Sequence, residues 1–84
     1  MAHYMTASGR AALAHTEEAL ETIHYYMLAY ERGSAFECEL LLIEALNAGV
    51  RLTFPLPTAA LRNAPNWPAI RALSLALTMP EGRP

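Results

Sequence analysis

The sequence predicts an all-α protein that forms one small helical domain over residues 1–84. Two segments carry apolar residues three and four positions apart, which is the spacing of one helix face. A glycine follows each segment, at Gly33 and at Gly49, where a left-handed residue commonly ends a helix. The expected elements are a helical hairpin at about 8–32 and 35–48, an extended arm at 50–54, a Pro-rich connection at 55–66, a helix at about 67–78, and frayed ends at 1–7 and 80–84.

The first predicted helix carries one apolar stripe with coiled-coil-like spacing that lasts for fewer than three heptads. The stripe consists of Leu13, Thr16, Leu20, Ile23, Met27 and Tyr30. Glutamates gather in the N-terminal half and Arg32 lies at the end, an order that suits the helix dipole. We therefore expect Leu20, Ile23 and Met27 in the core or in a dimer interface.

The second predicted helix begins with a capping box, because Ser34 is followed three positions later by Glu37. Its segment 36–48 is polar at only four places, and a helix that is apolar around most of its circumference has to be covered on most sides. A chain of 84 residues has few residues with which to cover such a helix. The sequence therefore predicts a homodimeric helical bundle with Leu42 and Leu46 in its core or dimer interface.

After Gly49 the periodicity changes, because Val50, Leu52 and Phe54 alternate with polar residues or proline. A period of two predicts a short extended segment, and the prolines that follow it confine such a segment to an edge or a loop. One helical turn is expected at 58–62. Asn66 is the expected N-cap of the last helix. The predicted apolar face of that helix is Trp67, Ile70, Leu73 and Leu77, with Arg71, Ser74 and Thr78 outside it.

Composition narrows the function classes. The chain has six arginines and eight glutamates but no Lys, Asp or Gln, which indicates GC-rich codons and favours a bacterial or phage source. A net charge of −2 with scattered arginines disfavours nucleic-acid binding, and the glutamate-rich segment 36–48 disfavours a helix-turn-helix reading. The single Cys38 cannot form an internal disulfide. With neither a secretory signal pattern nor an apolar run of membrane-spanning length, we expect a cytoplasmic protein.

An alternative reading is a ferritin-like di-metal site. Glu21 and His24 form an E-x-x-H pattern, and a dimer would bring two such pairs together with Glu37 or Glu44 as bridging carboxylates. Against this, Glu21 lies away from the apolar stripe, whereas metal ligands should point into the bundle. The three histidines and Cys38 match no compact zinc spacing. We therefore expect no cofactor, and a Cys38 side chain that serves as a small buried apolar group.

Tyr25 and Leu28 lie away from the apolar stripe and give the first helix a second apolar face. Aromatic and aliphatic anchors of this kind recruit partner proteins, so we expect a partner site at Tyr25 and Leu28, with Trp67 or the arm from Val50 to Phe54 nearby. The sequence thus favours a non-enzymatic, homodimeric regulatory adaptor or anti-activator that occludes a transcription factor or an enzyme. The alternatives are the di-metal bundle and a structural or secretion-chaperone-like subunit of a larger assembly.

Overall fold

The computed structural model describes the backbone of residues 7–78 and the side chains of residues 17–78. Its elements are helix α1 (Ala7–Glu31), helix α2 (Ala35–Asn47), the short 3-10 helix η2 (Ala59–Leu61) and helix α3 (Trp67–Thr78). The described residues contain no strand, so the all-α prediction is confirmed for them. The predicted frayed ends lie outside the described residues, except that Ala7 begins α1.

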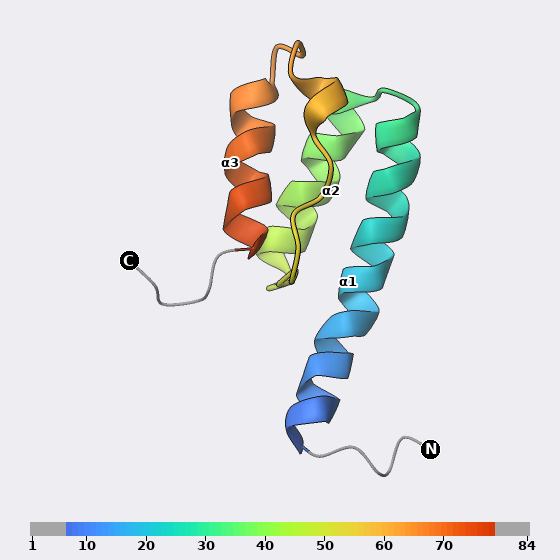
Figure 1. Ribbon diagram of the computed structural model, residues 1–84, viewed down its shortest axis with the longest axis vertical. Helices are drawn as coiled ribbons and strands as arrows, with labels where there is room; N and C mark the ends of the chain where they lie inside the picture. The colour runs from blue at the N-terminus through green and yellow to red at the C-terminus, as the bar shows by residue number, and fades with distance from the viewer. Residues whose placement is uncertain (1–6, 79–84) are drawn as a thin grey trace.

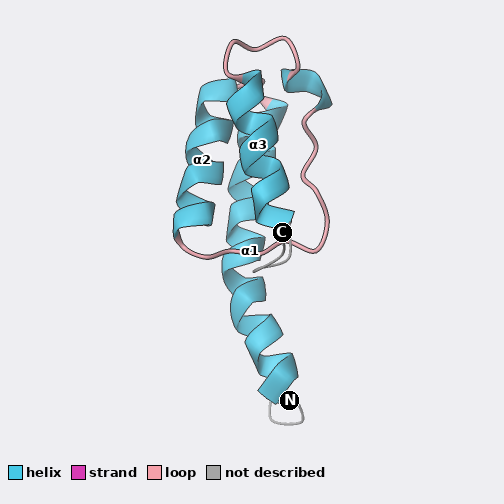
Figure 2. Ribbon diagram, turned by 90° about the vertical axis from the view of Figure 1, so that its left-hand side faces the viewer, coloured by secondary structure: helices cyan, strands magenta, loops and turns pink. Residues whose placement is uncertain are grey.

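The three helices and one extended segment surround a single core. Helix α2 packs against α1 on one flank and against α3 on the other. The segment 50–58 runs back along the bundle opposite α2, as the two views in Figures 1 and 2 show. The first turns of α1 extend beyond α2 and α3 (Figure 1). In the described part of the chain, no helix combines the length and the apolar character that a membrane crossing requires.

Local hydrogen bonds explain the sharp turn between α1 and α2. Gly33 has a positive φ of 72°, and its N–H donates to the Tyr30 carbonyl while the Ser34 N–H donates to the Ala29 carbonyl, both at 2.9 Å. This pair of bonds is a Schellman motif. The Ser34 hydroxyl then accepts from the Glu37 N–H at 3.3 Å and caps α2. Because the Ser34 N–H is already donated, the Glu37 carboxylate pairs with Arg32 and only half of the predicted capping box forms.

The segment 50–58 is an extended loop that closes the open side of the helix pair. Gly49 ends α2 with a φ of 79°, and the Val50 N–H bonds the Ala45 carbonyl. Val50, Leu52 and Leu56 are then buried, while Phe54 remains half exposed. The Leu52 N–H donates to the Leu77 carbonyl at 2.9 Å, which ties this segment to the end of α3. The helical turn expected at 58–62 is confirmed as η2 with Thr58 and Arg62 at its ends.

Tyr26 is the largest fully buried side chain of the core. Its hydroxyl donates to the Pro57 carbonyl at 2.7 Å, and its ring stacks on Tyr30 at a centroid distance of 6.0 Å. The Tyr30 hydroxyl in turn accepts from the Ala60 N–H at 3.0 Å. These two hydrogen bonds fasten α1 to η2 and to the segment that leads into it. The complete buried cluster is Ala19, Tyr26, Ala29, Cys38, Leu42, Ala45, Val50, Leu52, Leu56, Leu61, Ile70 and Leu77.

The buried face of α1 differs from the predicted stripe. Leu20 is 58% exposed and does not belong to the core of this chain, whereas Ile23 and Met27 pack at its edge. A second row of residues on α1 has the same three-and-four spacing as the predicted stripe and overlaps it: Ala19, Ile23, Tyr26 and Tyr30. Spacing alone therefore does not decide which of the two rows faces the core. The Tyr26 hydroxyl reaches the Pro57 carbonyl only when the row that contains Tyr26 faces the core. This hydrogen bond therefore decides how α1 is rotated about its axis.

Helix α3 follows the prediction with two corrections. Ile70 and Leu77 are buried and Trp67 and Leu73 pack at the edge, but Ser74, expected outside this face, is buried between them. A serine is small enough to sit on the stripe that Ile70 and Leu77 define at spacings of four and three. Asn66 precedes α3 as expected. Its amide nitrogen, however, donates to the Ala35 carbonyl at 3.0 Å and to the Glu39 carboxylate at 2.7 Å, which holds the start of α3 against α2.

A large part of the circumference of helix α2 is covered within one chain. Cys38, Leu42 and Ala45 are buried, and Leu41 and Leu46 are partly buried against the neighbouring helices. Phe36 and Leu40 point outward, and Phe36 is 70% exposed. The coverage that the sequence assigned to a second copy therefore comes largely from α1, α3 and the segment 50–58. Only an outer stripe of α2 is left uncovered.

Replacing Leu42 by alanine should lower the free energy of unfolding by about 2–5 kcal/mol, because a fully buried leucine leaves a cavity. Leu46→Ala should cost less than Leu42→Ala, since Leu46 is only partly buried. Leu40→Ala is the matched control on the same helix, 43% exposed in the structure, and should change little. Chemical denaturation followed by circular dichroism measures all three. Equal losses for Leu42→Ala and Leu40→Ala would contradict this packing.

Candidate functional site

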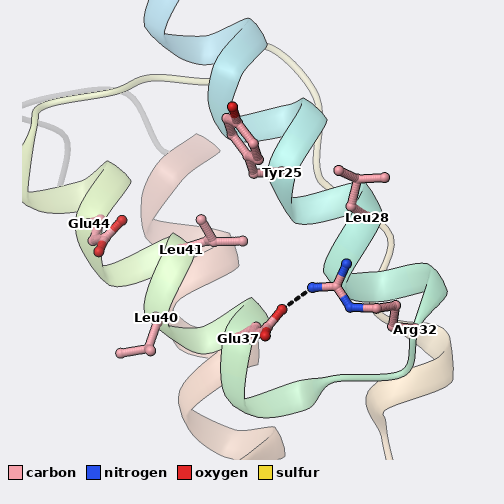
Figure 3. Close-up of a pocket in the computed structure, with 7 residues that line it drawn as sticks. All are labelled: Tyr25, Leu28, Arg32, Glu37, Leu40, Leu41 and Glu44. Carbon is pink, nitrogen blue, oxygen red and sulfur yellow. Dashed lines mark hydrogen bonds and ion pairs between the residues drawn. The ribbon is translucent and has the colours of Figure 1, made fainter.

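A groove follows the outer side of the contact between α1 and α2. One hollow of this groove has a volume of about 270 Å³ and is lined by Tyr25, Leu28, Arg32, Glu37, Leu40, Leu41 and Glu44. Figure 3 shows Tyr25 and Leu28 on α1 facing Leu41 on α2, with Leu40 on the outer edge. The partly buried Leu41 forms the floor, whereas Tyr25, Leu28 and Leu40 are 54%, 41% and 43% exposed. The centre of the groove is therefore apolar and open to solvent.

The tight hairpin explains why these residues meet. Because the turn at Gly33 reverses the chain within three residues, residues before and after the turn are brought together in antiparallel order. Arg32 lies opposite Glu37 next to the turn, and Leu28 lies opposite Leu41 further along (Figure 3). The groove is thus a direct product of the turn and of the rotation of α1.

Charged residues lie at both ends of the groove. Next to the turn, the Arg32 guanidinium pairs with the Glu37 carboxylate, and both side chains are about half exposed. Such an exposed ion pair contributes little to stability. At the other end the groove continues into a second hollow of about 210 Å³ that shares Tyr25, Leu41 and Glu44. The additional lining of this acidic end is Glu18, Glu21, Thr22, Ala45, Ala48 and Val50.

The structure places only part of the predicted partner site in this α1/α2 groove. Tyr25 and Leu28 line it, but Trp67 lines a different hollow, between α3 and the connecting segment, together with Arg62 and Arg71. Phe54 is half exposed on the extended segment and lines neither hollow. Trp67 thus lies apart from Tyr25, because α2 separates α1 from α3, whereas Val50 of the extended arm lines the acidic end of the groove together with Tyr25.

Sequence reasoning missed the part of the groove that α2 contributes. Leu40 and Leu41 of α2 were not singled out as candidate partner-binding residues, and neither was Glu18 of α1. The signal was present, since a hairpin with a three-residue turn fixes which positions of the two helices face one another. Tyr25 and Leu41 lie at equal distances from Gly33, eight residues before it and eight residues after it.

The residues of the alternative metal site do not come together within one chain. Glu21 and Glu44 line the acidic end of the groove, whereas Glu37 lies at the opposite end in its ion pair with Arg32. His24 is exposed, with its ring edge toward Tyr25 at a centroid distance of 5.0 Å. No three His, Cys, Asp or Glu side chains among the described residues are grouped so that they could hold a metal ion. A site shared between two chains stays a hypothesis.

Cys38 is fully buried in the core next to Tyr26. Burial raises the pKa of its thiol, although the hydrogen bond with the Tyr26 side chain acts in the opposite direction. Burial also raises the pKa of the Tyr26 hydroxyl, and the neighbouring thiol adds to that effect. Both groups are therefore protonated at neutral pH. A thiol that is protonated and enclosed is a poor nucleophile, because the thiolate is the reactive form.

In the folded protein, the Cys38 thiol should react with a disulfide reagent such as Ellman's reagent about a hundredfold more slowly than in denaturant, since it has to wait for the core to open. The chain has one cysteine, so the absorbance change reports on this position alone. The protein unfolded in guanidinium chloride is the control. A rapid stoichiometric reaction of the native protein at neutral pH would contradict the burial of Cys38. It would also support a role for the Cys38 thiol as a nucleophile.

No protein-family model matches this chain, and no curated protein or solved structure shows significant similarity to it. The α1/α2 groove and the surfaces around it are the features of this structure that bear on its function.

Proposed function

We propose that this protein acts without catalysis, by binding a second protein through the α1/α2 groove. The observation that carries the proposal is the clustering of Tyr25, Leu28 and Leu40 in one open hollow above Leu41. Contiguous exposed apolar side chains of this kind mark interaction sites, because leaving them in water costs free energy that a partner recovers. The aromatic Tyr25 and the leucines are the residue types that anchor such contacts.

The biological use that fits this groove is that of a small adaptor or anti-activator in the cytoplasm. Helix α2 has 13 residues and is therefore about 20 Å long, so the groove beside it accommodates a single helical segment. A protein that occupies one helix of a transcription factor or an enzyme can block the partner's own contacts without any chemistry of its own.

A homodimer is the proposed assembly, and its support is the outer stripe of α2. Phe36 is the most exposed of the large apolar side chains in the described residues, at 70%, and Leu40 follows it one helical turn later. Ile43 continues the same stripe and is partly buried. Phe36 and Ile43 lie outside the groove, and Leu40 lies at the edge that the stripe and the groove share, so pairing of two copies centred on Phe36 and Ile43 leaves Tyr25 and Leu28 accessible.

Tyr25→Glu and Leu28→Glu should each abolish recovery of the partner from the native host while leaving helix content intact, because both side chains are exposed in the groove. Leu75→Glu is the matched control, since Leu75 is 49% exposed on α3 and lies outside the groove. Affinity purification with quantitative mass spectrometry identifies proteins that the control retains and the groove variants lose. If all three variants retain the same proteins, the groove is not the binding surface.

Phe36→Glu should convert a dimer to a monomer, since it places a charge in the proposed seam, whereas Tyr25→Glu should leave the mass unchanged. Multi-angle light scattering at micromolar concentration measures both. A monomeric mass for the unaltered chain would remove the homodimer from the proposal, and loss of the dimer in Tyr25→Glu would place the seam in the groove.

A further inference from the structure

The negative charge of the molecule is concentrated along the α1/α2 groove. Four carboxylates line it, from Glu18, Glu21, Glu37 and Glu44, against the single guanidinium of Arg32, which gives a net charge of −3. The whole chain carries only −2, so the rest of the molecule is close to neutral or slightly positive.

The charge is also distributed unevenly along the groove. Arg32 is already paired with Glu37 next to the turn. Glu18, Glu21 and Glu44 gather at the other end, and none of them forms an ion pair within the residues that the structure describes. The described lining of the groove is therefore apolar in the middle, neutralised at one end and anionic at the other.

We propose that the occupant of this groove is a basic amphipathic helix. Its leucine or aromatic side chains lie on Tyr25, Leu28, Leu40 and Leu41, and its arginine or lysine side chains lie over Glu18, Glu21 and Glu44. An apolar stripe with anchors at i, i+3, i+4 and i+7 is the form in which a helix enters a groove, and opposite charges at the rim set register and select the partner. This inference rests on the proposed use of the groove for partner binding.

The same charges argue against a second copy of this chain as the occupant. Two grooves placed face to face bring together eight carboxylates and two guanidinium groups, a net charge of −6, and each guanidinium already has its own Glu37. Like charges brought together in an interface are unfavourable. An acidic partner meets the same repulsion, and so does the phosphate backbone of a nucleic acid.

Two synthetic peptides test the chemistry of the occupant directly. Both are helical, about four turns long to match α2, with leucines at i, i+3, i+4 and i+7, and they differ only in carrying arginine or glutamate on the flanks. Fluorescence anisotropy of the labelled peptides measures affinity, and amide shifts in the NMR spectrum of the labelled protein locate the site. The arginine peptide should bind at least about tenfold more tightly, less so at high salt, and should shift Tyr25, Leu28 and Leu41.

A matched pair of protein variants separates local from general charge effects. Glu21→Gln with Glu44→Gln removes two charges from the groove, whereas Glu17→Gln with Glu31→Gln removes two from exposed positions of α1 that line neither hollow of the groove. The first pair should weaken binding of the arginine peptide about tenfold, and the second should leave it nearly unchanged.

Three results would overturn the inference: equal or tighter binding of the glutamate peptide, equal effects of the two variant pairs, or no binding of the arginine peptide. Binding of the glutamate peptide in the groove refutes a basic occupant but leaves the groove as the partner site. Shifts of the groove residues that grow with protein concentration alone would assign the groove to a second copy. The proposed function itself fails if Tyr25→Glu and Leu28→Glu both retain the host proteins that Leu75→Glu retains.

Discussion

The burial of the Tyr26 side chain is the constraint on which the rest of the structure depends. Its ring is fully enclosed, and its hydroxyl has to find a hydrogen-bond acceptor because an unpaired polar group in the core is costly. The Pro57 carbonyl supplies that acceptor. One hydrogen bond thereby fixes two things at once: the rotation of α1 about its own axis and the position of the segment 50–58 across the open side of the helix pair.

The groove follows from that rotation. Successive residues of a helix point about 100° apart, so an inward Tyr26 turns its neighbour Tyr25 toward solvent, and Leu28 with it. The Schellman turn at Gly33 then sets α2 antiparallel to α1 and brings Leu41 beneath them. Tyr26 and Tyr25 illustrate how adjacent residues of one type divide between two tasks. Tyr26 fills the core, and Tyr25 is exposed in the groove.

The two ends of the groove differ in charge, a difference that its apolar residues alone do not provide. Among the residues that the structure describes, Glu18, Glu21 and Glu44 form no ion pair at one end, while Arg32 neutralises Glu37 at the other. The hollow beside α3 has the opposite character, since Arg62 and Arg71 lie there next to Trp67. A protein with a nearly balanced total charge thus presents two faces of different sign, and the apolar centre lies on the acidic one.

The sequence by itself determined where the helices begin and end, because those signals act over a few residues: Gly33 and Gly49 take up positive φ, and the Ser34 hydroxyl caps α2. It also indicated that Tyr25 and Leu28 lie off the core face. Only the tertiary structure decided between the two overlapping rows of α1, because the deciding bond joins positions 31 residues apart. For the same reason it alone revealed that the chain covers most of α2 by itself and that Trp67 lies in another hollow. Local spacing allows more than one face of a helix to point toward the core, and contacts between distant segments of the chain decide which face does.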